Sequence, residues 1–403
     1  MGSLNNTPNA DRIHIGIFGR RNAGKSSIIN AITNQNLAIV SDVKGTTTDP
    51  VSKAMELLPL GPVVIIDTPG IDDEGTLGEL RVKKSYQVLN KTDIAVLVTD
   101  CQHGIGDEEE KLIKKIKDKS IPYVVVFNKV DGLSQKTELQ ANQIYTSTVT
   151  GEGINELREL IAKQKEEDDI KLKLVGDLIN PSDFVVLVVP IDKAAPKGRL
   201  ILPQQQVIRD ILESDAIAIV TKEYELKETL ENIGKKPKMV ITDSQVFAKV
   251  SADTPKDILL TSFSILFARY KGELRELVKG AVAVETLKDG DTVLISEGCT
   301  HHRQCDDIGT VKIPRWLLQH TGKELKFETT CGTEFPEDLS KYSLIVHCGA
   351  CMLNQREVKY RIKCAQDRDI PIVNYGVLIA YLQGILKRSI EVFPSIAMEM
   401  EDI

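Results

Sequence analysis

The sequence lacks an excess of positive charge. Its 51 lysines and arginines are outnumbered by 58 aspartates and glutamates, which gives a formal net charge of −7 over 403 residues. Surfaces that bind nucleic acid are rich in basic residues, so this balance argues against RNA or DNA as a partner. Aromatic residues are also scarce, at 5%, with a single tryptophan. This scarcity argues against a basic and aromatic patch of the kind that binds single-stranded RNA, although an overall balance does not exclude a local basic patch.

Long hydrophobic runs are absent as well. No stretch reaches the roughly 20 apolar residues that a membrane-spanning helix needs, so no membrane partner is expected. Residues 1–12 are polar and contain no apolar signal core, so we expect a disordered segment and a cytoplasmic protein. Thiols stay reduced there. Five of the seven cysteines lie between residues 299 and 351, and this clustering indicates a local site.

The length exceeds that of one ordinary core, so two or three domains are expected. The alternation of apolar strand-like runs with helical patterns predicts an α/β protein. We expect a P-loop GTPase domain over 13–168, a small α/β oligomerisation domain over 175–262, and an α/β domain with a parallel sheet, which carries the clustered cysteines, over 263–403. A charged linker after residue 165 separates the first two.

A phosphate-binding loop lies near the beginning of the chain. The apolar run 14–18 leads into Gly19-Arg-Arg-Asn-Ala-Gly-Lys-Ser26 and then into a helical pattern, which is the context that this motif requires. Lys25 is expected to neutralise the β and γ phosphates, and the Ser26 hydroxyl to ligate Mg²⁺. The residues predicted to bind the phosphates of GTP are Asn22, Ala23, Gly24, Lys25, Ser26 and Ser27.

Three further motifs follow in the order of a GTPase. Asp67, at the end of a buried strand, is expected to hold Mg²⁺ through water, and the Gly70 amide to sense the γ phosphate. Thr47 is the predicted Mg²⁺-binding threonine of the first switch, with Thr48 as the alternative. Asp131 is expected to accept two hydrogen bonds from guanine, which favours GTP over ATP. The predicted base-binding residues are Asn128, Lys129, Asp131, Ser147 and Thr148.

These motifs and their spacing resemble the bacterial GTPases that include tRNA-modifying and ribosome-assembly members. Asn22 matches the asparagine that helps hold K⁺ against the phosphates in potassium-activated members. Ile71 stands where other GTPases often carry a water-positioning glutamine. The resemblance implies slow hydrolysis that is assisted by a monovalent cation. The alternative is that Asn22 only caps its own turn.

The middle of the chain carries no constellation that suggests chemistry. Strand-like runs at 183–191, 216–220 and 238–242 alternate with helical patterns. A small sheet with exposed edges can pair with a copy of itself, so we expect homo-oligomerisation through this segment.

The last third combines a parallel sheet with soft metal ligands. Strands are expected at 291–296, 325–327, 342–346 and 370–374, with one helical stretch over 262–279. Cys299 and Cys348 both follow strands. Because ligands gather beyond the carboxyl ends of parallel strands, the two loops are expected to meet at one crevice.

Cys299, Cys348 and Cys351 suit an iron–sulfur cluster with one iron left for another ligand. The same cysteines suit a structural zinc site of Cys₃His type, and ordinary core thiols are a third interpretation. Candidates for the fourth position are His301, His347, Asp306, Asp307 or an exchangeable ligand, with Cys305 as an alternative. Cys101, Cys331 and Cys364 are expected to be ordinary buried thiols.

Cys299-Thr-His301, followed after a gap in the mid-forties by His347-Cys-Gly-Ala-Cys351, resembles the pattern of the HydF family when it follows a potassium-type GTPase domain. These proteins are GTPase maturation factors of [FeFe]-hydrogenase. The resemblance implies a [4Fe–4S] cluster on Cys299, Cys348 and Cys351, with His301 as a weaker fourth candidate. It also implies a scaffold that receives a diiron precursor as cargo from two radical-SAM maturases and delivers it to apo-[FeFe]-hydrogenase.

Two other functions fit the same motifs. One is a ribosome-associated or tRNA-related GTPase with a structural zinc C-terminal domain, against which the acidic balance argues. The other is a structural zinc protein whose GTPase controls oligomerisation. Iron and sulfide would distinguish the HydF interpretation from both.

Overall fold

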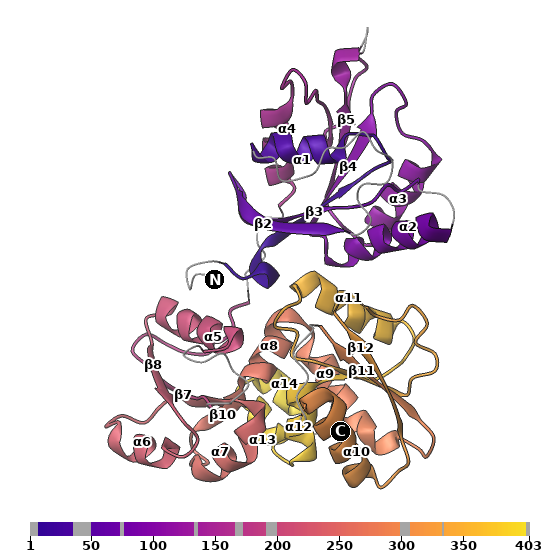
Figure 1. Cartoon of the computed structure of the whole chain (residues 1–403). Helices are drawn as coiled ribbons and strands as arrows, with labels where there is room; N and C mark the ends of the chain where they lie inside the picture. The colour runs from indigo at the N-terminus through magenta and orange to yellow at the C-terminus, as the bar shows by residue number, and fades with distance from the viewer. Residues whose placement is uncertain are drawn as a thin grey trace. The chain divides into compact units, whose positions relative to one another are not determined.

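The computed structural model describes residues 7–34, 50–72, 76–132, 136–165, 172–190, 200–298, 307–332 and 334–399. The chain divides into two compact units, Met1–Asp169 and Ile170–Ile403 (Figure 1). Three predicted site residues lie outside the described residues: Thr47, Cys299 and His301. Cys305 and Asp306 lie outside them too, as does the first half of the segment 1–12.

The first unit is a P-loop GTPase domain built on a six-stranded mixed sheet in the order β2-β3-β1-β4-β5-β6. Every neighbouring pair is parallel except β2 and β3, which run antiparallel. The strands are β1 (Ile13–Phe18), β2 (Val51–Leu57), β3 (Gly61–Asp67), β4 (Ile94–Asp100), β5 (Tyr123–Asn128) and β6 (Gln143–Tyr145).

Helices cover both faces of this sheet. They are α1 (Lys25–Thr33), α2 (Thr76–Val88), α3 (Asp107–Asp118) and α4 (Ile154–Lys163). Apolar residues of α1 and α4 pack in one hydrophobic core, and those of α2 and α3 pack in a second core. The β-branched strands are buried on both sides, as expected for a parallel sheet between two helical layers. The carboxyl ends of β1, β3 and β5 bring the nucleotide motifs to one edge.

The second unit contains two four-stranded parallel sheets. The first has the order β10-β9-β7-β8. Its strands are β7 (Phe184–Val188), β8 (Ile217–Thr221), β9 (Met239–Thr242) and β10 (Leu259–Ser262), and its helices are α5 (Leu202–Glu213), α6 (Leu226–Asn232) and α7 (Phe247–Asp253). At its edge, β8 exposes Ile217 and Val220 at 42% and 47% of their surface. This apolar edge is of the kind that pairs with another chain.

The second sheet has the order β12-β11-β13-β14 and is also entirely parallel. Its strands are β11 (Thr292–Glu297), β12 (Lys326–Cys331), β13 (Leu344–His347) and β14 (Ile372–Asn374). The helices of this part are α8 (Phe263–Lys271), α9 (Leu274–Val282), α10 (Ile313–Thr321), α11 (Gln355–Gln366), α12 (Tyr375–Leu382), α13 (Leu386–Ile390) and α14 (Pro394–Glu399). One continuous hydrophobic core joins both sheets of the unit.

The single helical stretch expected over 262–279 is wrong, because the structure has two helices there. α8 ends at Lys271 and α9 begins at Leu274. Gly272 interrupts the helix with φ of −130° and ψ of −147°, and a Cβ at this position would lie 3.0 Å from the side chain of Ile362. Because of this break, α8 ends at Lys271. The side chain of Lys271 contacts the loop that carries Cys348 and Cys351, which is called the cysteine loop below.

Candidate functional site

The phosphate loop joins β1 to α1. Gly24 has φ of 96° and lies directly before α1, so the free amides of the first helical turn face the loop. Lys25 Nζ donates hydrogen bonds to the carbonyl oxygens of Gly19 and Arg20 at 2.9 and 2.8 Å. The ammonium is therefore held within the loop, where it can meet the phosphates of a nucleotide.

Asp67 ends β3 beside this loop. Ser26 Oγ donates a hydrogen bond to Asp67 Oδ2 at 3.0 Å, whereas Oδ1 is buried with no hydrogen-bond partner among the described residues. Burial raises the pKa of the Asp67 carboxyl, although the Ser26 hydrogen bond and the charge of Lys25 oppose this shift. A hydroxyl and a carboxylate side by side form a donor set for Mg²⁺, which would also compensate the buried oxygen.

The predicted base-binding residues lie around the ends of β5 and β6. Asn128 is 1% exposed, and its Nδ2 donates to the Ala23 carbonyl at 3.1 Å, which ties this motif to the phosphate loop. A Cβ at Gly24 would lie 2.2 Å from the same Nδ2, so only glycine fits there. Ser147 Oγ donates to Asp131 Oδ1 at 2.5 Å and orients that carboxylate.

The two other residues predicted to bind the base are Lys129 and Thr148, which directly follow Asn128 and Ser147. Lys129 has φ of 65°, and its Nζ donates to Asp100 Oδ2 at 2.8 Å. Thr148 is half-buried directly after Ser147. The structure therefore places these predicted residues at one edge of the sheet.

The residues expected to act on the γ phosphate are only partly described. Gly70 is buried, and a Cβ there would lie 3.0 Å from the Arg21 amide nitrogen. Ile71 is 2% exposed, and its apolar side chain offers no group that positions water. Asn22 is exposed in the left-handed conformation, with φ of 62°. That conformation is tolerated by asparagine and leaves its amide open to solvent.

The second candidate site lies at the carboxyl edge of the sheet β12-β11-β13-β14. Ser296 of β11 pairs with His347 of β13, and His347 pairs with Asn374 of β14. Cys348 therefore emerges at the same level as the end of β11. Its amide donates to the Ser296 carbonyl at 3.0 Å, which fixes the beginning of the cysteine loop to the neighbouring strand.

The Cys348 sulfur receives two backbone amides. Gly298 N–H donates to Cys348 Sγ at 3.0 Å, and Ala350 N–H donates to it at 3.4 Å. Amides directed at a sulfur favour its thiolate form, which is the form that binds metal. Both Cys348 and Cys351 are half-buried. The sulfur and its amide donors therefore fit a thiolate ligand.

The loop between the two cysteines is shaped by Ala350. This residue has φ of 54°, a left-handed conformation that costs a non-glycine residue about 1–2 kcal/mol. A Cβ added at Gly349 would meet no atom of the described residues within 4 Å. Such strain persists where surrounding contacts impose the geometry, as at binding sites.

His347 is fully engaged in hydrogen bonds. Its Nδ1 lies 2.8 Å from the Cys348 carbonyl, which can only accept, so Nδ1 carries the proton. Its Nε2 then accepts from Arg361 Nη1 at 3.2 Å. With both ring nitrogens occupied, His347 is not a ligand in this arrangement, although the sequence left it as a candidate.

Arg361 organises this edge of the sheet. It is completely buried and pairs with Glu357 at 2.9 Å. Its other nitrogens donate to Ser296 Oγ at 3.1 Å and to the Gly332 carbonyl at 2.8 Å. Arg361 thus links the ends of three strands. The sequence reasoning missed it, although the spacing of Glu357 and Arg361 on one helix face was a visible signal.

The comparisons with known proteins follow this division of the chain. Residues 14–129 match the family model described as a 50S ribosome-binding GTPase. Residues 174–272 match the hydrogen maturase F dimerization domain, and residues 275–392 match the hydrogen maturase F tetramerization domain. The chain belongs to the hydrogen maturase F family. This agrees with the resemblance drawn from the cysteine pattern.

Curated relatives match mainly the first unit. The tRNA modification GTPase MnmE of Nitrosomonas europaea is 31% identical over 156 residues, which are 38% of this chain and 34% of that protein. MnmE of Legionella pneumophila (strain Corby) is 35% identical over 36% of this chain and 33% of that protein. MnmE of Desulforamulus reducens is 30% identical over 54% and 46%. This chain thus spans only about a third to a half of the length of these relatives.

Among solved structures, Era of Aquifex aeolicus is 20% identical, with a TM-score of 0.34 over 55% of this chain and 98% of that one.

None of the helices in the described part of the chain combines the length and hydrophobicity that crossing a bilayer requires. Within those same residues, no group of three or more histidine, cysteine, aspartate or glutamate side chains is arranged to hold a metal ion. Cys299, the third predicted sulfur donor, lies outside them.

The prediction that Cys101, Cys331 and Cys364 are buried is wrong, because all three are half-buried. Cys331 ends an edge strand, which leaves one side open. Cys101 lies in the turn after β4, where its Sγ donates to the Lys129 carbonyl at 3.0 Å. Positions at a sheet edge, in a turn or on an outer helix face retain solvent contact even when the residue type favours burial.

Proposed function

We propose that this chain is a GTP-hydrolysing scaffold that holds a [4Fe–4S] cluster and carries a diiron precursor to apo-[FeFe]-hydrogenase. The observation that carries this proposal is the amide of Gly298 at 3.0 Å from Cys348 Sγ. Gly298 directly precedes Cys299 in the chain, so the strand end that leads to one predicted ligand lies beside the sulfur of another. The membership in the hydrogen maturase F family supports the same function.

The GTPase residues act by positioning and by charge. Lys25 would stabilise the negative charge on the β and γ phosphates, the Ser26 hydroxyl would ligate Mg²⁺, and Asp67 would hold the ion through water. Thr47 and the Gly70 amide are proposed to respond to the γ phosphate. Asp131 selects guanine from its fixed position beside Ser147. The reaction is hydrolysis of GTP to GDP and phosphate.

The cluster ligands are proposed to be Cys299, Cys348 and Cys351, and the thiolate donors of the described loop fit such a group. When bound, the cluster supplies an iron with a position that exchangeable ligands or the cargo can occupy. His301 is the remaining histidine candidate for that position, since His347 donates and accepts elsewhere. Asp307 has its Oδ2 occupied by the Thr310 amide at 2.8 Å.

The partners follow from this role. The match to dimerization and tetramerization domains supports a homo-oligomer, and the apolar edge of β8 offers one surface for it. Two radical-SAM maturases as donors of the precursor, and apo-[FeFe]-hydrogenase as its acceptor, are part of the proposal.

Anaerobic purification tests the proposed cluster directly. We expect a brown protein with about four iron and four acid-labile sulfide ions per chain after reconstitution, because three thiolates hold a cubane cluster. The metals are measured by plasma emission and the sulfide by a colorimetric assay. A colourless protein with one zinc ion per chain would contradict the proposal and favour a structural zinc domain.

GTP turnover is expected to depend on the monovalent cation. If Asn22 helps hold K⁺ against the phosphates, turnover should be about tenfold faster in K⁺ than in Na⁺, since about 1.4 kcal/mol of transition-state stabilisation is tenfold in rate. Phosphate release is measured in matched chloride buffers. The Asn22→Ala chain should lose the difference. Equal rates in both salts for the unaltered chain would refute the role of the cation.

A further inference from the structure

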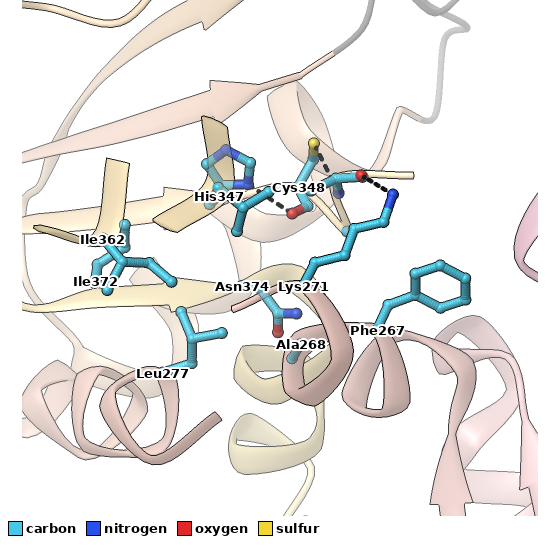
Figure 2. A pocket seen from close by; sticks show the side chains of 12 residues that line it. Phe267, Ala268, Lys271, Leu277, His347, Cys348, Ile362, Ile372 and Asn374 are labelled. Atoms are coloured by element: carbon cyan, nitrogen blue, oxygen red, sulfur yellow. Dashed lines mark hydrogen bonds between the residues drawn. The ribbon is translucent and has the colours of Figure 1, made fainter. Parts of the chain in front are cut away.

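Lys271 lies beneath the cysteine loop although it belongs to a distant part of the chain. It ends α8 and is 2% exposed. It lies within the segment that matches the dimerization domain, whereas Cys348 and Cys351 lie within the segment that matches the tetramerization domain. Figure 2 shows its side chain extending from α8 toward the loop that follows β13. A lysine is rarely buried to this extent unless its ammonium has strong partners.

The partners of Lys271 are carbonyls of the cysteine loop. Its Nζ donates to the carbonyl oxygens of Ala350, Cys351 and Leu353 at 3.2, 3.3 and 2.9 Å. The ammonium also lies 5.5 Å from the ring centroid of Phe267, within the range of a cation–π contact. The three donors of an ammonium are thus directed at the backbone around the second cysteine.

These contacts match the unusual conformation of the loop. Ala350 adopts its left-handed φ of 54° at the point where the carbonyls turn toward Lys271, and the same turn directs the Ala350 amide at Cys348 Sγ. The carbonyls of Ala350, Cys351 and Leu353 face the ammonium, while the Ala350 amide faces the Cys348 sulfur. The lysine therefore holds the backbone arrangement that presents the thiolates.

The charge has a second consequence. Each thiolate and each reduced state of a cluster adds negative charge, and a fixed cation nearby stabilises the more negative state. A low-dielectric environment strengthens this interaction, because little water reaches the ammonium. The side chains that line the small cavity around Lys271, among them Phe267, Leu277 and Ile362, are largely apolar.

We propose that Lys271 is a positioning residue of the cluster site: it fixes the loop that carries Cys348 and Cys351 and raises the reduction potential of the bound cluster. This inference rests on the proposed function. It assigns a role to a residue outside the cysteine pattern and in another segment of the chain.

The test compares full-length, reconstituted chains with lysine replaced. Lys271→Met removes the charge and the donors at similar volume, and Lys271→Arg keeps both. Lys279→Met is the matched control, because Lys279 is exposed on α9 and pairs with Glu276. Three quantities are measured: the rate at which iron is lost to a chelator, the midpoint potential from spectroelectrochemistry, and the electron paramagnetic resonance spectrum of the reduced cluster.

We expect Lys271→Met to lose iron roughly tenfold faster than the unaltered chain, as for other residues that support metal ligands. Its midpoint potential should be more negative, and Lys271→Arg should lie nearer the unaltered value. Lys279→Met should behave as the unaltered chain. An unchanged potential and an unchanged rate of iron loss in folded Lys271→Met would overturn the proposal.

Folding of the second unit, which contains Lys271, is checked by circular dichroism. If Lys271→Met does not fold, Lys271→Gln provides the neutral chain for the same measurements. If neither neutral chain folds, Lys271 serves the fold and not the site, and the proposal is wrong. If the unaltered chain itself takes up no iron and sulfide, the proposed function fails, which is a different result from a cluster that ignores Lys271.

Discussion

Replacing Cys348 and Cys351 together by serine is expected to remove the cluster while GTP hydrolysis continues at its normal rate. A serine hydroxyl remains protonated at neutral pH and is a harder ligand than a thiolate, so it does not replace the sulfur on iron. Almost no iron and sulfide should remain bound, because two of the three proposed thiolate ligands are gone, and delivery of the diiron precursor to apo-hydrogenase should be lost. GTP turnover should persist, because the phosphate loop and the cysteines belong to different compact units.

The matched control is Cys364→Ser, since Cys364 is half-buried on α11, outside the cysteine pattern. This chain should retain its iron, its sulfide and its GTP turnover. The measurements are metal and sulfide analysis, phosphate release, and hydrogen evolution by hydrogenase incubated with the loaded scaffold. Full iron and sulfide in the double variant would show that these cysteines do not hold the cluster.

Asp131→Asn is expected to change the nucleotide specificity from GTP to xanthosine triphosphate. In the proposed function, the Asp131 carboxylate, which accepts a hydrogen bond from Ser147 Oγ, also accepts hydrogen bonds from the N1–H and the 2-amino group of guanine. Loss of two charge-assisted hydrogen bonds, at about 1.5–3 kcal/mol each, weakens GTP binding by roughly 10²- to 10⁴-fold. Xanthine carries a carbonyl in place of the 2-amino group, and the asparagine amide can donate to it. Xanthosine triphosphate should therefore bind and turn over.

Binding is measured by titration calorimetry and turnover by phosphate release, with GTP and xanthosine triphosphate in parallel. Asp118→Asn is the control, because Asp118 is exposed at the end of α3 and makes the same chemical change. The cluster content of both variants should stay at the level of the unaltered chain. Unchanged affinity of Asp131→Asn for GTP would show that Asp131 does not recognise guanine.

The nucleotide-binding motifs could be predicted from the sequence because each one consists of residues that are close together in the chain. A glycine before a helix, an acid at the end of a buried strand and an asparagine at the end of a later strand are defined by neighbouring residues. The structure places Ser26 against Asp67, and Asn128 against Ala23. Their order along the chain already implied this, because the carboxyl ends of parallel strands share one edge.

Only part of the cysteine site could be predicted from the sequence. The periodic runs predicted β11 and β13, and with them the position of Cys348 at a strand end. The helical pattern over 262–279 concealed a break, because the extended backbone of Gly272 interrupts an otherwise continuous periodicity. That break decides where Lys271 lies.

By itself, the sequence determined the GTPase fold, the α/β class and the cysteines that suit soft metals, since residue type and short-range spacing encode these properties. Only the tertiary structure decided which groups surround the cysteine loop. Lys271 and Ala350 are 79 residues apart, and Arg361 contacts Ser296 across 65 residues. Such contacts depend on how helices pack against a sheet, and no local pattern records that packing. For the same reason His347, a possible ligand by its position in the chain, lies in the structure between an arginine and a carbonyl.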